Sequence, residues 1–356
     1  MVIKSNLDVL TIGNKKIGSG YPPYIIAEAG VNHNGYLGLA LALVDAAATA
    51  GADAVKFQTF KAHDVVTNRS QLATYQEENI GKGKNQLQML KELELPDEFY
   101  QPVIDRCHQV GIEFLSTPYG SRTSVAWLES LGVNAYKVAS ADLVNYLLLE
   151  QVALTNKPLI LSSGMATMPE IKDAIRFVRS RGNNNIMMLH CTTNYPCPPE
   201  EVNLAAMQTM MKELDVIVGY SDHTQDHQAA IMATALGAQV YECHFTLDKC
   251  LPGPDHVASA EPDDLAARVK AIKAVPILMG NAIKGPTQSE ESSMIVTMRR
   301  SVVAGRNLAK GHILSASDLE AKRPAGGLPP NLFEQLLGKK LKKDKLADEL
   351  ITLKDV

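Results

Sequence analysis

The chain has 356 residues, more than the ~100 to 200 of a typical single domain, so a large domain joined to a small one is expected. A formal net charge of -4 and 46% hydrophobic residues are typical of a soluble globular protein and argue against binding to nucleic acid or to an anionic membrane. The five cysteines have no CxxC spacing, which argues against a disulfide framework or a structural zinc site and favours reduced thiols.

The N-terminal stretch, MVIKSNLDVLTIGNKKIGSG, lacks the apolar core of a secretory signal peptide. No later apolar run approaches the ~20 residues that a membrane-spanning helix needs. We therefore expect a cytoplasmic protein with no membrane partner.

From residue 24 onward, short strand-like runs alternate with longer segments of helical periodicity. The eight runs are YIIAEAG, AVKFQTF, EFLSTPY, AYKVAS, LILSSG, IMMLHCT, VIVGYSDH and QVYECHFT. Between them lie helix candidates such as 37–51, 168–182 and 228–237, several of which end at the glycine that commonly follows a helix. This order predicts an α/β fold of the (β/α)8 TIM-barrel type, because a doubly wound sheet more often carries a glycine-rich phosphate loop after its first strand.

The long connection after the second strand, residues 61–96, interrupts this regular alternation. Most of it reads SQLATYQEENIGKGKNQLQMLKELEL, which is helical in character. Long loops in barrels are usually functional, so this insert is expected to lie over the C-terminal ends of the strands.

The composition changes beyond residue 280. Residues 281–296 are polar and are interpreted as a linker between a barrel domain at 1–280 and a small domain at 297–356. This tail carries 12 Lys and Arg against 7 Asp and Glu, whereas the rest of the chain carries 23 against 32. It also contains two similar segments, GRNLAKG and GKKLKKD, followed by SASDL and TLKDV, which predict two β-rich halves related by a pseudo-twofold axis.

Polar side chains collect where the predicted strands end. In a barrel, alternate residues point inward, and active sites form at the C-terminal ends of the strands. The inward positions near these ends are Glu28, Lys56, Gln58, Thr117, Lys137, Ser140, Ser162, Thr193, Ser221, His223 and His244. Two lysines among several hydroxyl groups are typical of a phosphate site. His223 and His244 end neighbouring strands, so they can offer two imidazoles to one divalent metal that keeps open positions for water and substrate.

Each of these side chains also has a plainer interpretation. A single strand histidine is more often a hydrogen-bonded core residue than a ligand, but two at adjacent strand ends favour the metal site. Lysines usually lie at the surface, whereas the inward positions of Lys56 and Lys137 favour a function. Thr117, Ser162 and Ser221 either bind a ligand or hydrogen-bond the backbone of their own turns, and the sequence leaves both interpretations open.

Three residues near the sixth predicted strand have side chains of the types that form a metal site. They are His190, Cys191 and Cys197. Alternation along the strand sends His190 and Cys191 to opposite faces, so we interpret both cysteines as thiols without a function.

In their order along the chain, nine motifs resemble those of the sialic acid synthase family. They are IAEAGVNHNG, AVKFQTF, STPY, YKVAS, SSGM, HCTTNYP, GYSDHT, HFTLDKCLPGPDH and KRPAGG. The resemblance implies a phosphoenolpyruvate-condensing barrel followed by a small β-rich domain similar to type III antifreeze proteins, the SAF or β-clip fold. It also implies a homodimer whose swapped C-terminal domain reaches over the barrel of the partner.

The resemblance also implies roles for particular residues. The two metal-binding histidines of the family, which usually hold manganese or magnesium, fall on His223 and His244. Its phosphoenolpyruvate contacts fall on Lys56, Thr117, Lys137, Ser140, Ser162 and Ser221, and its sugar contacts fall on Gln58, Tyr195, Asp255 and Arg323, the last acting in the neighbouring active site. The acidic residue beside the reacting carbons falls on Glu28. The implied reaction joins phosphoenolpyruvate, water and an open-chain N-acylated amino sugar into a nine-carbon 2-keto sugar acid and phosphate.

Two positions depart from the family pattern. Cys243 stands where lysine or arginine is usual, and Thr193 stands where some sialic acid synthases have asparagine. Alternation turns Cys243 away from the lumen, whereas Thr193 touches the pocket, and whether Thr193 or Asn194 contacts the substrate stays open. Thr193, the insert and AGGLPP resemble bacterial members that act on N-acetylmannosamine or on a 2,4-diacetamido-2,4,6-trideoxymannose leading to legionaminic acid. The sequence leaves this choice open, because a few pocket contacts decide it.

Two other functions remain as alternatives. Another phosphoenolpyruvate or aldol enzyme on the same barrel would act on a sugar phosphate and would need a further cluster of basic residues, which the sequence does not show. A carbohydrate-binding or ice-binding protein would use the tail as its active module. An ice-binding face should be flat and uncharged, whereas this tail is rich in lysine.

Overall fold

The computed structural model describes residues 9–81, 83–120 and 122–356 and divides into two compact units. The first unit ends at Gly280 and the second begins at Asn281. The first eight residues of the N-terminal stretch, and Lys82 within the predicted insert, lie outside the described residues. Among the residues that are described, no helix is both long enough and apolar enough to cross a membrane.

Eight parallel strands form the sheet of the first unit. Their bounds are β3 Tyr24–Gly30, β4 Ala54–Thr59, β5 Glu113–Pro118, β6 Tyr136–Val138, β7 Leu159–Ser162, β8 Ile186–Cys191, β9 Ile217–Asp222 and β10 Val240–His244. The sheet order is β5-β4-β3-β10-β9-β8-β7-β6, and contacts between β5 and β6 bring the two ends of this order together. The predicted TIM-type barrel is therefore confirmed, and each of the eight predicted runs contains one of its strands.

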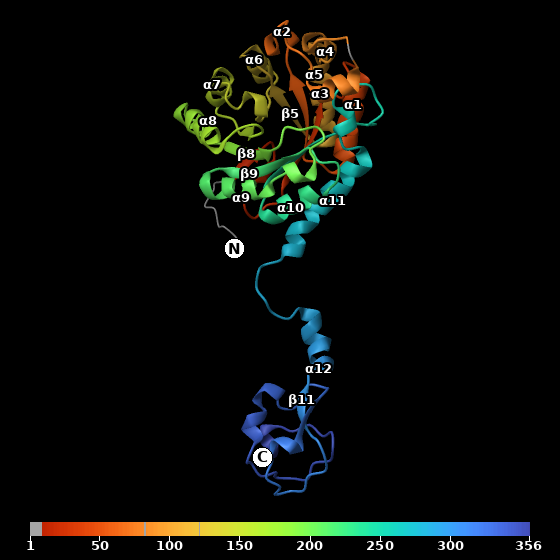
Figure 1. Ribbon diagram of the computed structural model, residues 1–356, viewed down its shortest axis with the longest axis vertical. Helices are drawn as coiled ribbons and strands as arrows, with labels where there is room; N and C mark the ends of the chain where they lie inside the picture. The colour runs from red at the N-terminus through yellow and green to blue at the C-terminus, as the bar shows by residue number, and fades with distance from the viewer. Residues whose placement is uncertain (1–8, 82, 121) are drawn as a thin grey trace. The chain divides into compact units, whose positions relative to one another are not determined.

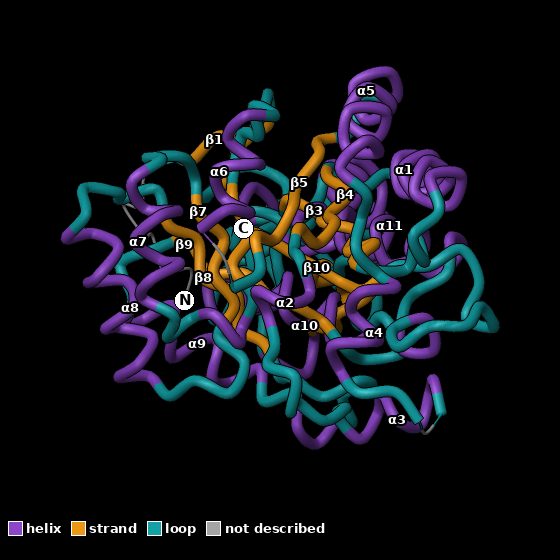
Figure 2. The backbone as a smooth tube through the Cα atoms, turned by 90° about the horizontal axis from the view of Figure 1, so that it is seen from above, coloured by secondary structure: helices purple, strands orange, loops and turns teal. Residues whose placement is uncertain are grey.

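Helices surround the strands, as Figures 1 and 2 show. The helices that follow the eight strands in turn are α1 Leu37–Ala50, α5 Tyr100–Val110, α6 Arg122–Ser130, α7 Tyr146–Leu154, α8 Met168–Ser180, α9 Leu204–Glu213, α10 Gln228–Leu236 and α11 Pro262–Met279. The insert folds into three short helices, α2 Ala62–Val65, α3 Thr74–Ile80 and α4 Gln86–Glu92. Gly51 and Gly237 cap α1 and α10 in the left-handed conformation, with φ of 86° and 111°, so these two predicted helix ends are confirmed.

Strand alternation separates two apolar layers. Outward residues such as Ile25, Ala27 and Ala29 of β3 pack in the large core that the helices cover. Inward residues near the strand starts, such as Ile26, Leu115 and Ile160, form a second core inside the barrel. Gly219 also lies on an inward position of β9, where an added Cβ would come within 2.4 Å of the Val240 carbonyl oxygen, so the close approach of β9 and β10 requires glycine.

A short hairpin precedes the barrel and was not predicted. It consists of β1 Leu10–Ile12 and β2 Lys15–Ile17, which pair antiparallel. Ile12 and Ile17 are fully buried in the inner core, so the hairpin closes the end of the barrel at which the strands start.

A buried ion pair braces β9 and β10 from the helix side. Asp222 accepts hydrogen bonds from Arg268 of α11 at 3.0 Å and from the Tyr241 hydroxyl at 2.8 Å. It also accepts the backbone N–H of Thr224 at 2.8 Å, and Arg268 donates to the Thr224 carbonyl at 3.0 Å. This network fixes the turn that begins with His223, directly after the end of β9.

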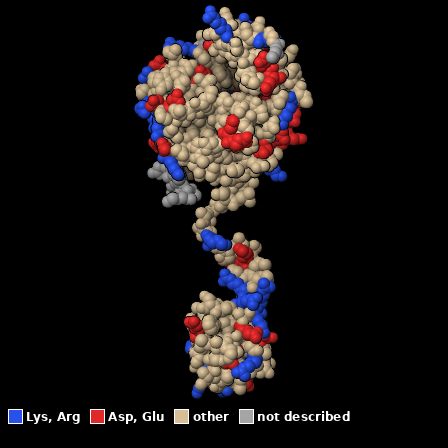
Figure 3. All heavy atoms as spheres, in the orientation of Figure 1, with Lys and Arg blue, Asp and Glu red and all other residues tan. Residues whose placement is uncertain are grey.

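The second unit pairs β11 Ser301–Ala304 with β12 Leu319–Lys322 around its own apolar core, formed by residues such as Val302, Leu314 and Ile351. The chain forms the helical turns η5 Glu290–Met294 and α12 Ile295–Met298 at the end of the predicted linker, and α12 extends two residues beyond it. Acidic and basic side chains are interspersed on the face that Figure 3 shows.

The two similar segments of the tail form matching structures. The backbones of Leu308 and Lys345 donate hydrogen bonds of 2.8 Å to each other. The two parts of the tail are therefore paired antiparallel at these two residues. In the first half, buried Asp318 pairs with Arg306 and His312 at 2.6 and 3.0 Å. In the second half, buried Asp355 pairs with Lys343 and Lys345 at 3.0 and 3.1 Å. This correspondence agrees with the predicted duplication.

The ion pair between Asp222 and Arg268 gives a stability prediction. Asp222→Ala leaves the guanidinium of Arg268 buried without its counter-ion, so the free energy of unfolding should fall by about 3 to 5 kcal/mol. Asp215→Ala is the control, because Asp215 is exposed and lies 3.7 Å from Arg179 at the surface, and it should change stability by less than about 0.5 kcal/mol. Chemical denaturation of the two variants measures both values. Equal losses would contradict the bracing role of Asp222.

Candidate active site

A cavity of about 510 Å³ opens at the C-terminal ends of the barrel strands. Every site residue predicted in the barrel lines it, namely Glu28, Lys56, Gln58, Thr117, Lys137, Ser140, Ser162, Tyr195, Ser221, His223, His244 and Asp255. Arg323 belongs to the second unit, where its Nε donates to the Met298 carbonyl at 3.1 Å. Alternation and the fold thus bring the barrel residues to one place, and their roles stay predictions.

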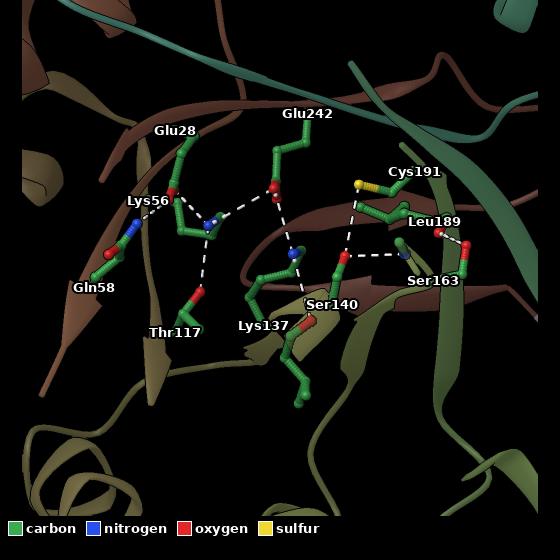
Figure 4. A network of polar contacts seen from close by, with 12 residues as sticks. Glu28, Lys56, Gln58, Thr117, Lys137, Ser140, Ser163, Leu189, Cys191 and Glu242 are labelled. Carbon is green, nitrogen blue, oxygen red and sulfur yellow. Dashed lines mark hydrogen bonds and ion pairs between the residues drawn. The ribbon is translucent and has the colours of Figure 1, made fainter. Parts of the chain in front are cut away.

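Two lysines and two glutamates form a buried network at the floor of the cavity (Figure 4). Lys56 Nζ lies 2.5 Å from Glu28 Oε2 and 3.7 Å from Glu242 Oε1, and Lys137 Nζ lies 3.4 Å from the same Glu242 oxygen. Lys56 also donates to Thr117 Oγ1 at 3.3 Å. Glu28, Lys56 and Lys137 are each only 3% exposed, so these charges are held almost entirely out of water.

Glu242 is a site residue that the sequence reasoning missed. It lies two positions before His244 on β10 and therefore points into the barrel with it. The same alternation that selected His244 was the signal that could have found it. Its carboxylate is the counter-ion shared by the two lysines of the floor.

Burial and neighbouring charges shift the pKa values of Glu28 and Glu242 in opposite directions. The pKa of Glu28 is raised, chiefly by burial and also by the charge of Glu242, although Lys56 opposes the shift. Burial alone would raise the pKa of Glu242 too, but Lys137 and Lys56 together lower it. Glu242 is therefore the permanent anion of the floor, and Glu28 is the carboxyl group better suited to carry a proton.

Hydroxyl groups line the cavity on the side of β6, β7 and β8. Ser140 Oγ accepts the backbone N–H of Gly164 at 3.0 Å. The buried hydroxyls of Ser162 and Thr193 have no hydrogen-bond partner within the described part of the chain. A Cβ added to Gly164 would come within 2.0 Å of Thr193 Oγ1, so glycine is required beside these hydroxyls. Buried hydroxyls without partners are suited to donate to an anion in the cavity.

The sequence left open whether Thr117, Ser162 and Ser221 bind a ligand or the backbone of their own turns. Thr117 pairs with Lys56 across the floor, and Ser162 makes no bond to the backbone of its own turn. Both observations favour ligand binding for these two residues. Ser221 lines the same cavity.

His223 and His244 lie side by side, with ring centroids 5.3 Å apart. Nδ1 of His223 donates to the Thr192 carbonyl at 2.7 Å, since a carbonyl oxygen can only accept, which leaves Nε2 as the free donor atom for a metal. Nδ1 of His244 is buried and has no partner among the described residues, and burial lowers its pKa so that the ring is neutral. Two adjacent imidazoles that each keep a ring nitrogen available for coordination fit a divalent metal ion.

The described residues hold no group of three or more His, Cys, Asp and Glu side chains arranged to bind a metal by themselves. A metal on the two histidines would therefore complete its coordination with water and substrate, as an open catalytic site does. Cys243 packs in the outer core, so the prediction that it turns away from the lumen is confirmed.

His190 and Cys191 lie on opposite faces of β8, as predicted. His190 points outward and its Nε2 bonds the Val202 carbonyl at 2.8 Å, whereas Cys191 lines the cavity. The Cys191 sulfur lies 3.9 Å from His223 Nδ1. Burial alone would raise the pKa of this thiol, but the charge and hydrogen bond of His223 lower it to about 7. Cys197 packs in the core outside the barrel.

The insert forms one wall of the cavity, which confirms its predicted position over the strand ends. The ring of Tyr75 in α3 lies 5.1 Å from the ring of Tyr195, which in turn lies 4.2 Å from His223. Asn79 donates to the Pro254 carbonyl at 2.6 Å, beside Asp255. Burial, followed by the charge of Glu28, raises the pKa of Asp255 to about 7. The cavity thus extends from the charged floor past the histidines to the insert.

Comparison with known proteins gives consistent matches along the chain. The NeuB family matches residues 43–284, and the SAF domain matches residues 299–356. The chain is 43% identical to N,N'-diacetyllegionaminic acid synthase of Campylobacter jejuni over 92% of its own length and 98% of that protein. It is 41% identical to the protein of the same name from Legionella pneumophila, over 92% and 93% of the two chains.

Among solved structures, the chain resembles N-acetylneuraminic acid (sialic acid) synthetase from Leptospira borgpetersenii. The TM-score is 0.71 and the sequence identity is 34%, over 81% of this chain and 95% of that chain. The similarity therefore holds for both the sequence and the fold.

The position of Glu242 between two lysines gives a prediction for the site. Glu242→Gln leaves two buried ammonium groups short of a counter-ion, so the free energy of unfolding should fall by about 3 kcal/mol. Millimolar phosphate should raise the melting temperature of this variant more than that of the unchanged protein, because a bound anion replaces the missing charge. Glu213→Gln, which removes an exposed pair with Lys172, should cost less than about 1 kcal/mol. An unchanged stability of Glu242→Gln would contradict the shared counter-ion.

Proposed function

Because the chain belongs to the NeuB family, we propose that it is a nonulosonic (sialic) acid synthase that joins phosphoenolpyruvate to an N-acylated amino sugar. Water is consumed, and the products are a nine-carbon 2-keto sugar acid and phosphate. The observation that carries the proposal is the pairing of two buried lysines and unpartnered hydroxyls with two adjacent histidines in one cavity. The family resemblance drawn from the motifs is confirmed by the matches to both domains.

The charged floor suits phosphoenolpyruvate. This substrate carries a phosphate and a carboxylate, so its site must supply several positive charges and directed donors. Lys56 and Lys137 supply the charge, and the hydroxyls of Thr117, Ser140, Ser162 and Ser221 line the same cavity. Binding of the anion lets the lysines exchange part of their pairing with Glu28 and Glu242 for the substrate.

We further propose that His223 and His244 hold Mn²⁺ or Mg²⁺. When bound there, such an ion acts as a Lewis acid that polarises the aldehyde of the open-chain sugar. The free nitrogens of the two rings, the neutral state of His244 and the hydrogen bond from His223 to Thr192 support this assignment.

The reaction forms a bond between C3 of phosphoenolpyruvate and the aldehyde carbon, adds water at C2 and releases phosphate. Glu28 is the residue proposed to move the proton between the attacking water and the new hydroxyl, because its carboxyl lies at the floor and its pKa is raised by burial. Gln58 Nε2 donates to Glu28 Oε1 at 3.1 Å and holds that carboxyl in place. Lys56 and Lys137 stabilise the negative charge on the departing phosphate.

The acceptor sugar would lie beyond the histidines. Gln58, Tyr195 and Asp255 line the cavity and are proposed to contact this sugar, and Thr193 lines the same cavity with a hydroxyl that has no partner among the described residues. Arg323 is proposed to complete the sugar site in a homodimer, where the SAF domain of each subunit serves the barrel of the other. The match of a SAF domain to residues 299–356 supports this arrangement.

We place the reaction in the cytoplasm. All five cysteines lie in the described part of the chain and are free thiols, four of them buried. Such a set is typical of a reducing compartment.

A sugar phosphate is a poorer candidate for the acceptor. Lys56 and Lys137 are the only lysines among the described residues that line the cavity, arginine is not among those residues, and both lysines lie at the floor. A second phosphate group at the far end of the acceptor would therefore find no further cation among the barrel residues that line the cavity.

The proposed reaction predicts phosphate release that depends on both substrates and on metal. The protein is incubated with Mn²⁺, phosphoenolpyruvate and either N-acetylmannosamine or 2,4-diacetamido-2,4,6-trideoxymannose, and free phosphate is measured. Release should require the sugar and stop on addition of a chelator, and excess Mn²⁺ should restore it. If neither sugar leads to phosphate release, the synthase function is contradicted. Phosphate release that continues in the presence of the chelator would contradict only the metal proposal.

The swapped dimer predicts complementation between two inactive variants. Glu28→Gln should lose turnover by about 10²-fold or more while it still binds phosphoenolpyruvate. Arg323→Ala should lose sugar binding. Co-expression of the two should restore about a quarter of the activity, because half of the dimers are mixed and each mixed dimer keeps one intact site.

The matched control for this experiment pairs Glu28→Gln with Lys137→Met. Both changes lie in the barrel, so every site of a mixed dimer carries one of them and no activity should return. Restored activity in this control pair would contradict the exchange of Arg323 between subunits. A lack of restored activity in the pair Glu28→Gln and Arg323→Ala would contradict it as well.

A further inference from the structure

Asp255 is carried to the cavity by the loop between β10 and α11. Its backbone carbonyl accepts the Ser259 hydroxyl at 2.7 Å, but none of the described residues donates a hydrogen bond to its carboxyl group. The place of this carboxyl in the cavity therefore depends on how the backbone of the loop is held.

Asn34 holds this loop at two points. It lies in the turn between β3 and α1, at the C-terminal end of the barrel strands. Its Nδ2 donates to the Pro252 carbonyl at 2.9 Å, and its Oδ1 lies 3.2 Å from Nε2 of His256. One amide group thus contacts the loop on both sides of Asp255 in the chain.

The partners of Asn34 fix the proton positions of His256. The Pro252 carbonyl can only accept, so the amide nitrogen of Asn34 faces it and the amide oxygen faces His256. Nε2 of His256 therefore carries the proton and donates it. The ring is fully buried, and burial lowers its pKa to about 4, so its Nδ1 accepts from the Thr246 hydroxyl at 2.7 Å. With both nitrogens engaged, the ring has a single orientation.

The backbone on both sides of this contact is adapted to it. Asn34 has a φ of 50°, in the left-handed region that asparagine adopts more readily than most residues. In the loop, a Cβ added to Gly253 would come within 2.6 Å of Cδ2 of His256, so the chain passes directly across the ring and requires glycine there. The turn and the loop are thus fitted to each other.

Two further asparagines hold the same loop. Asn32 donates to Ser259 Oγ at 2.9 Å, and that hydroxyl donates to the backbone carbonyl of Asp255. Asn79 of α3 donates to the Pro254 carbonyl at 2.6 Å. The loop is therefore tied both to the turn between β3 and α1 and to the insert.

We infer that Asn34 is a positioning residue for the acceptor sugar, because its bonds to Pro252 and His256 fix the loop that presents Asp255. The inference rests on the proposed contact between Asp255 and the sugar. Asn34 and His256 are not among the described residues that line the cavity, so they act on the substrate only through the loop. A displacement of about 1 Å can cost about 10²-fold in rate, so loosening the loop should impair use of the sugar.

Asn34→Gly removes both bonds and keeps the backbone, because glycine adopts the left-handed conformation without strain. With whichever of N-acetylmannosamine and 2,4-diacetamido-2,4,6-trideoxymannose supports phosphate release, it should raise the KM for the sugar by about 10-fold. The KM for phosphoenolpyruvate should change by less than about 2-fold. Asn156→Gly is the matched control, because Asn156 has a φ of 55°, is exposed and precedes β7 at the end where the strands start. It should leave both KM values unchanged.

A double-mutant cycle separates positioning from a general loss of structure. In an Asp255→Ala background the loop presents no carboxyl group, so Asn34→Gly should lower kcat/KM for the sugar by only about 2-fold or less. His256→Gln can place an amide N–H close to the position of Nε2 and should retain use of the sugar, whereas His256→Asn is too short and should lose about 10-fold. A melting curve of each variant shows whether it is folded.

An unchanged KM for the sugar in Asn34→Gly would overturn the inference and leave the synthase function standing. Equal losses from Asn34→Gly with and without the Asp255 carboxyl, or equal rises in the two KM values, would also overturn it, because they indicate a general loss of structure. If the unchanged protein releases phosphate with neither sugar, the proposed function is overturned, and the inference with it.

Discussion

The site depends on one buried carboxylate placed between two buried lysines. Glu242 on β10 lies 3.7 Å from Lys56 and 3.4 Å from Lys137, and these three side chains come from different strands. Ammonium groups held out of water are stable only if they are paired or lose their protons. Against the effect of burial, Glu242 and Glu28 raise the pKa of Lys56, whereas burial lowers the pKa of Lys137 despite the nearby charge of Glu242. An arriving anion finds positive charge already in position, so little reorganisation is needed on binding.

The barrel fold confines the buried charged groups of this site to one end of the barrel. Its inner core and the β1–β2 hairpin fill the end at which the strands start, so polar residues are confined to the opposite end. Outside the sheet, Asp222 and Arg268 brace the turn that carries His223. The Thr192 carbonyl fixes the ring of His223, and both histidines line the cavity.

The insert adds the part of the site that the barrel itself does not supply. Its helices place an aliphatic surface beyond the histidines and touch the loop of Asp255 through Asn79. The charged floor and the apolar wall therefore differ in chemistry, because the floor presents buried lysines and carboxylates and the wall presents aliphatic side chains.

The sequence by itself determined the barrel, its eight strands and the lining residues from Glu28 to His244, because a period of two fixes which side chains point inward and parallel strands end at one face. It did not reveal the β1–β2 hairpin, whose three-residue strands are too short to show a period. Only the tertiary structure decided that Glu242 serves both lysines, that Cys191 faces the cavity, and that the insert presents its aliphatic side chains there. Those facts depend on distances between segments remote in sequence, which packing of the whole barrel sets and local periodicity does not.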